Sequence, residues 1–375
     1  MLVVLVVLHA YIGARLLPDL GAGSAAIVAG SVLLALSAFV IPRGFRARRA
    51  AASRHGARVA WAGLVAMGAF STLFVLTFLR DVGLAIALTV AALTPVAVPM
   101  ATIVHASALA VPVITALVTA VGYLNARRVA AVRRVDVPID TLPQALHGFT
   151  IAQITDLHVG PTIGRDHVEA IVVAVNELGA DMVAITGDLV DGSVRQLASQ
   201  IEPLTRLASR HGTFFVTGNH EYYSGAHAWL HELRRLGLNV LMNEHVVVEH
   251  DGAELVVAGV TDYGAHHFDP SHRSDPAAAI DGAPPSAAAK VLLAHQPRSA
   301  IAAAEAGFHL QLSGHTHGGQ FLPWNWFVRL QQPFTAGLDR LDRLWVYTSR
   351  GTGYWGPPKR FGAPSEITCL RLVAA

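Results

Sequence analysis

Four long apolar stretches occupy the first 134 residues and constrain the fold of this chain more than any other feature. They run from Leu2 to Leu17, Ala22 to Ile41, Val59 to Leu79 and Gly83 to Leu124. About 20 consecutive apolar residues form a helix long enough to cross a bilayer. Because four such stretches follow one another, buried helices of a soluble domain are a poor alternative. The sequence predicts a transmembrane region over residues 1–134 with four or five helices.

The last stretch leaves the number of spans open. It fits one long span with an interfacial piece, or two short spans that turn near Pro95 and Pro99. The arginine-rich loop over residues 43–58 is cytoplasmic under the positive-inside rule. Four spans then leave the C-terminal half in the cytoplasm, and five place it outside. We expect a multi-pass protein of the cell membrane, with the side of its C-terminal half open.

Charge is divided unequally between the two halves of the chain. Residues 1–134 hold 12 Arg, no Lys and two acidic residues, whereas residues 135–375 hold 16 Lys and Arg against 24 Asp and Glu. The overall hydrophobic content of 53% and mean hydropathy of +0.44 therefore reflect the membrane region. An acidic soluble half argues against nucleic acid as a partner, because that partner requires a clustered basic face.

The second half of the chain alternates between short apolar runs and helical patterns. Residues 135–148 are typical of an extended linker, because Pro138 and Pro143 disfavour helix at the preceding residues. Helical spacing follows over residues 166–178, 196–209 and 228–236. This alternation predicts a layered α/β domain over residues 149–375. The last two runs, 344–348 and 367–372, have no helix between them, so we expect part of the sheet to be antiparallel. Residues 275–289 are expected to form a surface loop.

Five short apolar runs end beside side chains suited to binding a metal. The runs cover residues 151–155, 182–186, 214–217, 291–294 and 310–313. The side chains that follow them are Asp156, His158, Asp188, Asn219, His295, His315 and His317. Runs of this length indicate buried strands, and ligands of α/β sheets gather at the carboxyl ends of strands. A sixth run, 255–260, ends at Thr261 and Asp262 and is expected to serve as scaffold.

Seven such side chains suit two divalent cations, whereas a single zinc site uses three or four. Two cations about 3.5–4 Å apart stabilise both the attacking and the leaving oxygen of a phosphoryl displacement. One carboxylate must bridge them, and Asp188 at the end of a central run is the natural candidate. His220 lies next to the predicted ligand Asn219, where it could protonate the leaving group as a general acid.

Five motifs resemble the signature of the calcineurin-like metallophosphoesterases, and they occur in the order of that family. They are Asp156-x-His158, Gly187-Asp188-x-x-Asp191, Gly218-Asn219-His220-Glu221, Ala294-His295 and Gly314-His315-Thr316-His317. The run Gly314–Gln320, with Glu221-Tyr222-Tyr223, is similar to a bacterial branch that is often membrane-associated. Any one motif alone would be weak, but all five in order are specific.

The resemblance implies a β-sandwich core flanked by helices and a centre of two divalent metal ions (Mn, Fe or Zn). It implies that Asp156, His158, Asp188 and His317 surround one ion. The other ion would be held by Asp188, Asn219, His295 and His315. It also implies that His220 acts on the leaving group, and it places Asp191 outside the ligand set.

The sequence thus predicts a membrane-anchored, metal-dependent phosphoester hydrolase that uses a metal-activated water. A lipid or lipid-linked phosphodiester is an attractive substrate, since the anchor holds the site near the membrane. A diester is favoured because its alkoxide leaving group must be protonated, which His220 could do. The alternative is a membrane sensor or scaffold with a structural metal site. Trp324, Trp326 and Phe327 fit either a lip against lipid or core packing, and nothing in the sequence indicates a protein partner.

Overall fold

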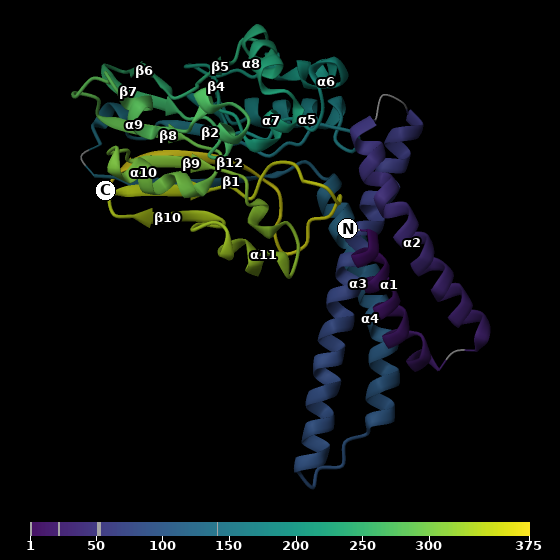
Figure 1. Ribbon diagram of the computed structural model, residues 1–375. Coiled ribbons are helices and arrows are strands. Elements are labelled where there is room, and N and C mark those ends of the chain that lie inside the picture. The colour runs from purple at the N-terminus through teal and green to yellow at the C-terminus, as the bar shows by residue number, and fades with distance from the viewer. Residues whose placement is uncertain (1, 22, 51–53, 141) are drawn as a thin grey trace. The chain divides into compact units, whose positions relative to one another are not determined.

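The computed structural model describes the chain except residues 1, 22, 51–53 and 141 and the side chains of residues 48–50 and 54 (Figure 1). It divides into two compact units. The helical unit comprises Met1–Leu124 and Gly356–Lys359, and the α/β unit comprises Asn125–Trp355 and Arg360–Ala375.

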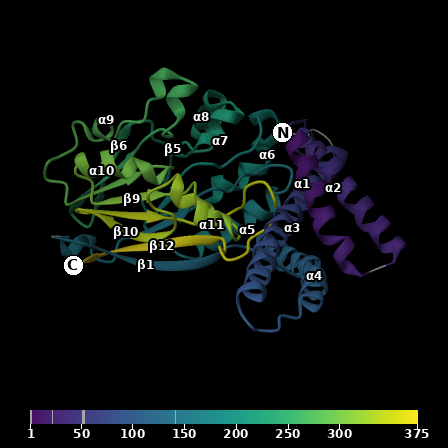
Figure 2. The same ribbon diagram turned by 60° about the horizontal axis from the view of Figure 1, so that its bottom comes forward.

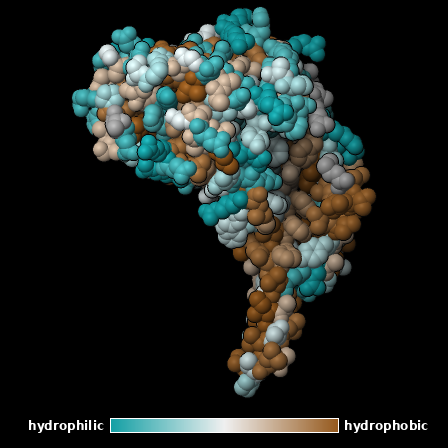
Figure 3. All heavy atoms as spheres, turned by 60° about the vertical axis from the view of Figure 1, so that its left-hand side comes forward, coloured by the Kyte–Doolittle hydropathy of each residue, from teal (hydrophilic) through white to brown (hydrophobic). Residues whose placement is uncertain are grey.

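The helical unit contains, within the described residues, four helices that are long and apolar enough to cross a membrane. They are α1 (Leu2–Leu16), α2 (Ser24–Ala50), α3 (Arg54–Leu93) and α4 (Met100–Arg127). Large apolar side chains such as Leu33, Leu93 and Leu117 are exposed on them, and Figure 3 shows the helices covered by hydrophobic residues. In water such a surface would be strongly unfavourable, so the protein is a multi-pass membrane protein.

The helix boundaries differ from the apolar stretches of the sequence at two points. Most of the arginine-rich segment expected to be a loop is helical, because α2 continues to Ala50 and α3 begins at Arg54. Helix α3 continues through Arg80 and Asp81, because Arg80 forms an ion pair with Asp19 and a hydrogen bond to the hydroxyl of Ser107 within the same unit. The fourth stretch is therefore divided: residues 83–93 complete α3, and α4 begins at Met100. The break falls at residues 94–99, at the two prolines expected to turn the chain. Part of the arginine-rich loop, residues 51–53, lies outside the described residues.

The α/β unit is built on two six-stranded mixed sheets (Figures 1 and 2). The first has the order β1 (Ala131–Ile139), β12 (Glu366–Ala374), β2 (Thr150–Ile154), β3 (Met182–Ile185), β4 (Thr213–Phe215) and β5 (Asn239–Val240). The second has the order β10 (Gly337–Leu341), β11 (Leu344–Thr348), β9 (Leu310–Ser313), β8 (Ala289–Leu293), β7 (Ala253–Gly259) and β6 (Glu244–His250). Strands β2, β3 and β4 are parallel, as are β7, β8 and β9, whereas β12 is antiparallel to β2 as expected for a late strand.

The main core lies between the two sheets. Met182 and Phe214 of the first sheet pack in one buried cluster with Val291 and Leu312 of the second. Alternate side chains of the first sheet face a second cluster with α5 (Arg165–Asn176), α6 (Val194–Ile201) and α8 (Ala226–Arg235). Helices α9 (Pro276–Ile280) and α10 (Ala300–Glu305) cover the other sheet. Both faces of the inner strands are buried, which explains the continuous apolar runs. The predicted β-sandwich flanked by helices is confirmed.

Two segments differ from their sequence-based interpretation. Residues 131–139, part of which was expected to be a linker, form β1 and pair in parallel with β12. Pro138 is compatible with this strand because β1 lies at the sheet edge, where one side of the backbone needs no partner. Residues 276–280 of the expected surface loop form α9. Asp275 caps this helix by accepting hydrogen bonds from the backbone N–H groups of Ala277 and Ala278, and Pro276 occupies its first position.

Candidate metal centre

The loops that follow β2, β3, β8 and β9 bring predicted ligands together at one end of the sandwich. Most of these side chains are buried, and Asp156, His158, Asp188 and His295 are each at most 3% exposed. Five predicted ligands have a left-handed backbone, with φ between 51° and 68°: Asp156, His158, Asp188, His315 and His317. Non-glycine residues adopt this region at a cost, and such strain is typical of functional sites.

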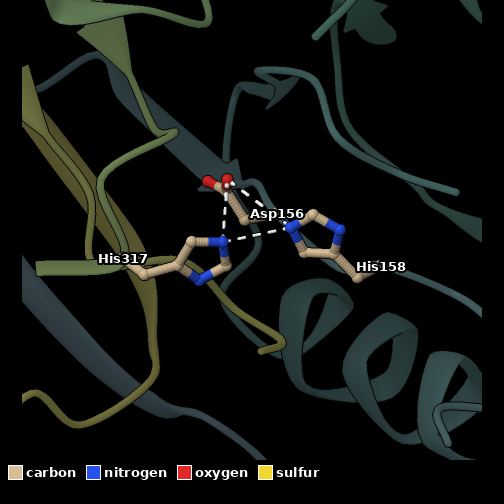
Figure 4. Close-up of side chains that lie close together, drawn as sticks. All are labelled: Asp156, His158 and His317. Carbon is tan, nitrogen blue, oxygen red and sulfur yellow. Dashed lines mark hydrogen bonds and ion pairs between the residues drawn. The ribbon is translucent and has the colours of Figure 1, made fainter. Parts of the chain in front are cut away.

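Asp156, His158 and His317 form a first cluster, in which the three side chains point toward one another (Figure 4). The Nε2 atoms of the two histidines lie 3.1 Å apart, and Asp156 Oδ1 lies 3.4 Å from His317 Nε2 and 4.0 Å from His158 Nε2. Two nitrogen ligands that bind one ion at about 2.1 Å are separated by roughly 3–3.5 Å. The first cluster therefore fits a divalent cation.

Asp188, His295 and His315 form a second cluster. His295 Nε2 lies 3.2 Å from Asp188 Oδ2 and 3.2 Å from His315 Nδ1. Asn219 is the first residue of helix α7 (Asn219–Ser224) and lies directly before His220, whose backbone N–H donates to Asp188 Oδ1. Within the described part of the chain, the buried Oδ1 atom of Asn219 has no hydrogen-bond partner. A buried unsatisfied oxygen is costly, and an oxygen-binding cation would satisfy it.

Asp188 lies between the two clusters. Its Oδ2 atom is 3.2 Å from His295 Nε2 of the second cluster and 3.8 Å from His158 Nε2 of the first. The backbone of Gly218 lies very close to the carboxylate of Asp188. A Cβ atom on Gly218 would lie 2.2 Å from Asp188 Oδ1, so only glycine fits at that position. Asp188 thus has the position required of a ligand shared by two ions.

Hydrogen bonds, burial and neighbouring charges set the protonation states of the predicted ligands. His295 Nδ1 lies 2.8 Å from the carbonyl oxygen of Thr186, which can accept only from an Nδ1–H, so Nε2 is the nitrogen that faces Asp188. Burial alone would lower the pKa of His295, but Asp188 and Asp156 raise it well above its usual value, so binding of a cation at Nε2 would release a proton. Burial lowers the pKa of His315 to about 3 and the pKa of His317 well below its usual value, so both imidazoles are neutral. Burial alone would raise the pKa of Asp188, but His295 and His220 hold it well below the usual range. Neutral imidazoles and ionised carboxylates are the forms that bind a cation.

His220 lies beside the ligands and is oriented by Asp191. Asp191 Oδ1 is 2.5 Å from His220 Nδ1, and its Oδ2 is 3.3 Å from His158 Nδ1. The other ring nitrogen of His220 lies 3.9 Å from Asp188 Oδ2, and its side chain is 14% exposed. Asp191 therefore contacts the outer nitrogens of two histidines, while the inner nitrogens face the centre. This arrangement leaves His220 near both the predicted ligands and solvent.

Two residues that position the centre were not identified from the sequence. Glu221 was noted only as part of a motif. Its buried carboxylate accepts hydrogen bonds from the backbone N–H groups of Gly218, Asp188 and Leu189, and so joins the two ligand loops. Burial raises the pKa of Glu221 to about 7. The buried guanidinium of Arg360 donates to the carbonyl oxygen of His317 and lies 3.0 Å from His317 Nδ1. Arg360 belongs to no motif, and 43 positions separate it from His317 along the chain.

Exposed aromatic rings surround His220. The rings of Tyr223 and Trp355 lie 5.1 Å and 6.1 Å from the His220 ring, and Phe268 packs against Tyr223 at 5.5 Å. All three aromatic residues are exposed, whereas Tyr222 is buried. Arg165, at the start of α5, pairs with Glu202 and donates to the carbonyl oxygen of Ser199. The approach to the centre is therefore apolar rather than basic.

The site thus consists of a sandwich of two mixed sheets that brings two candidate metal-binding clusters of histidine and carboxylate side chains to one end. The family model described as calcineurin-like phosphoesterase matches residues 149–319. The chain belongs to this family of metallophosphoesterases, and its four apolar helices make it a membrane protein.

Three relatives illustrate this similarity. A bovine (Bos taurus) transmembrane protein with metallophosphoesterase domain is 42% identical over 280 residues, which cover 72% of this chain and 62% of the relative. A metallophosphoesterase of Helicobacter pylori strain J99 is 43% identical, with 60% of this chain and 59% of the relative covered. A metallophosphoesterase of Aquifex aeolicus is 30% identical and is covered over 91% of its length, with 64% of this chain. The chain thus spans less than two thirds of the length of the first two relatives.

Proposed function

We propose that this protein hydrolyses a phosphoester with two divalent metal ions held at the two clusters. Asp156, His158 and His317 would hold one ion, and Asn219, His295 and His315 the other, with Asp188 shared. The observation that carries this proposal is the position of Asp188 Oδ2 between His295 and His158. When bound, a pair of divalent cations supplies charge stabilisation for the phosphoryl group and a water of lowered pKa.

His220 is the residue that we propose to protonate the leaving oxygen. Asp191 holds its Nδ1 atom, which fixes the orientation of the ring and directs Nε2 toward the centre. A histidine held in this way is suited to general acid catalysis, because it can transfer a proton at neutral pH without reorienting. A phosphodiester with an alkoxide leaving group benefits most from such an acid, so a diester is the preferred substrate class.

A lipid or lipid-linked phosphoester is the substrate that we propose. Only residues 128–130 separate the end of α4 from the start of β1, so the connection to the membrane helices spans about 10 Å. The exposed rings of Tyr223, Phe268 and Trp355 next to His220 can contact the apolar part of such a molecule. A soluble sugar or nucleotide phosphate has no need of this surface.

The segment that follows the last metal motif supports a membrane-surface substrate. Helix α11 (Trp324–Phe327) and the turn after it expose Trp326 (68%), Phe327 (52%) and Leu330 (82%), so these residues do not serve as core. The segment is pinned to the metal loop at Gly319, where a Cβ atom would lie 2.1 Å from the backbone of Asn325. Tryptophan and phenylalanine favour the membrane–water interface. We propose that this segment rests on lipid and orients the centre toward it.

Hydrolysis assays on the purified full-length protein test this function. Loaded with Mn²⁺, the protein is expected to hydrolyse bis-p-nitrophenyl phosphate and to release phosphate or a headgroup from components of a total lipid extract. Absence of hydrolysis of both bis-p-nitrophenyl phosphate and p-nitrophenyl phosphate would contradict the proposed reaction. Hydrolysis of the nitrophenyl esters without any lipid product would retain the reaction and reject the lipid.

A further inference from the structure

A second group of metal-ligating side chains lies in the α/β unit outside the centre described above. It consists of His227 on α8, Asp269, and His272 at the end of a short 3₁₀ turn (Pro270–His272). One ligand atom from each residue lies within 4.8 Å of the other two. We propose that these residues bind one additional transition-metal cation of the zinc type.

The contacts of Asp269 leave one of its oxygens for an ion. Its Oδ1 atom accepts hydrogen bonds from the backbone N–H and the hydroxyl of Ser271. Its Oδ2 atom faces both imidazoles, at 3.1 Å from His227 Nε2 and 3.9 Å from His272 Nε2. A simple surface ion pair requires one histidine, not two directed at the same oxygen. Ligand atoms of a tetrahedral zinc site lie roughly 3–3.5 Å apart. A small movement of the three side chains toward one another would therefore bring their ligand atoms to the spacing that zinc requires.

His272 is oriented as a metal ligand. Its Nδ1 atom lies 2.9 Å from the hydroxyl oxygen of Tyr222, which leaves Nε2 on the side of Asp269. Metal-binding histidines usually make such an outer hydrogen bond, which fixes the ring and the tautomer. The half-buried His272 is thus preorganised, whereas the exposed His227 supplies the mobile ligand.

The surroundings of the cluster indicate which cation it takes. His231 follows His227 by four positions on α8, so both lie on the same helix face, and both line an open groove of about 660 Å³ together with His272. His231 is therefore a candidate for a fourth ligand. Arg234 and Arg235 also line this groove, and Arg235 is paired with Glu232. Imidazole-rich sites with one carboxylate bind Zn²⁺ in preference to Mg²⁺ or Ca²⁺, which require several oxygen ligands.

An ion at this position would join α8 to the loop that carries Phe268 and His272. That loop packs on the aromatic residues next to the catalytic centre, because Phe268 contacts both Tyr222 and Tyr223. Tyr222 is bonded to His272 and directly follows Glu221, the residue that holds the ligand loops. The additional cation would therefore stabilise one wall of the approach to the centre. Its binding does not depend on the proposed hydrolysis.

Zinc content of the full-length protein tests this site. The protein is purified in detergent with an affinity tag that lacks histidine, equilibrated with Zn²⁺, freed of excess metal and analysed by mass spectrometry. We expect the double variant His227→Ala/His272→Ala to hold one zinc ion per chain fewer than the wild type. His267→Ala is the matched control, since this exposed histidine of the same loop lies outside the cluster and its removal should leave the zinc content unchanged.

A conservative variant distinguishes loss of the metal site from loss of the folded structure. Asp269→Asn keeps the size of the side chain and its acceptor for Ser271, and it is expected to weaken binding of the additional zinc at least tenfold. Co²⁺ substitution provides a second readout: tetrahedral absorption in the visible range should be lower in both variants than in the wild type. Equal zinc content and equal Co²⁺ spectra in all four proteins would overturn the site. Either result leaves the hydrolysis assays unaffected, so the two proposals can fail separately.

Discussion

The imidazole of His220 is held on one side by Asp191, and its other side faces the predicted metal ligands. This geometry predicts a dependence on the leaving group. His220→Ala should lower kcat about 10²–10⁴-fold for an alkyl phosphodiester, whose alkoxide must be protonated. The loss should be less than about tenfold for bis-p-nitrophenyl phosphate, because p-nitrophenolate leaves without a proton. The measurement is kcat for both esters at saturating Mn²⁺.

Two further results decide the role of His220. The metal content of His220→Ala should equal that of the wild type, since His220 is not among the predicted ligands. An equal loss of kcat on both esters would show that His220 supports the structure of the centre rather than the departure of the leaving group. Asp251→Asn is a suitable control, because Asp251 forms an exposed pair with Arg210 away from the centre.

At the residue scale, the strand-end pattern predicted the two clusters because parallel strands end at one edge of the sheet. Asp156 and His158 follow β2, and Asp188 follows β3, so pairing of β2 with β3 brings their loops together. The positioning residue Arg360 could not be predicted in this way. It reaches His317 from a loop near the end of the chain, and no periodicity or spacing connects the two. The cluster of His227, Asp269 and His272 is assembled from a helix and a loop, so it too has no local motif.

At the element scale, helix α7 (Asn219–Ser224) is attached to the loop after β3 through Glu221. Glu221→Gln should lower the stability of the protein and its affinity for metal. The glutamine amide nitrogen would face backbone N–H groups that now donate to a carboxylate, and an unsatisfied buried donor costs about 1–3 kcal/mol. Thermal unfolding in detergent and the Mn²⁺ dependence of hydrolysis measure the two effects.

Glu169→Gln provides the comparison for this variant. Glu169 forms an exposed ion pair with Arg206, and such pairs contribute about 0–1 kcal/mol. Its unfolding temperature and its metal dependence should stay close to those of the wild type. If Glu221→Gln behaved in the same way, the buried hydrogen bonds of Glu221 would not be what holds the two loops together.

Helix α11 and the turn after it make an element-scale prediction about lipid. Replacing Trp326, Phe327 and Leu330 by alanine removes the exposed apolar side chains without opening the core. Hydrolysis of a phosphoester presented in a bilayer should fall at least tenfold, whereas hydrolysis of bis-p-nitrophenyl phosphate should be unchanged. Ile301→Ala on α10 is the control, because it removes a similarly exposed apolar side chain elsewhere. A parallel loss on both substrates would place the segment in the centre rather than on lipid.

Elements buried on both faces were predictable from the sequence, whereas edge elements were not. Strands β3 and β8 lie inside the sheets, where both of their faces are buried, so their sequences are continuous apolar runs. Strand β1 carries Arg133, Arg134 and Pro138, and its partner β12 lies more than 200 positions away, so nothing local identifies it. Helix α9 had a local signal in Asp275 and Pro276 that alanine-rich composition obscured.

At the scale of the whole molecule, the four helices make a prediction about sidedness. Helices α3 and α4 lie between the arginine-rich loop and the α/β unit along the chain, so two crossings return the chain to the same side. The positive-inside rule places that loop in the cytoplasm, and we therefore propose a cytoplasmic α/β unit. The protein has a single cysteine, Cys369, which makes labelling straightforward.

Cysteine accessibility in cells measures this topology. In a Cys369→Ser background, Ala278→Cys introduces a thiol at an exposed position of α9. A membrane-impermeant maleimide should label it only after the cells are opened. Labelling in intact cells would show that the α/β unit is outside, as expected if the region had an odd number of crossings between the loop and this unit.

The central claim is that two metal ions act together at Asp188, and a Mn²⁺ titration of metal-stripped full-length protein tests it most directly. The rate of bis-p-nitrophenyl phosphate hydrolysis is measured against added Mn²⁺ for the wild type and for Asp188→Asn. A shared ligand predicts no hydrolysis without metal, little at one equivalent, and a maximum that requires occupancy of both sites. Asp188→Asn should weaken both binding steps and abolish most of the rate. A full rate at one equivalent, or loss of only one binding step in Asp188→Asn, would contradict the two-metal account.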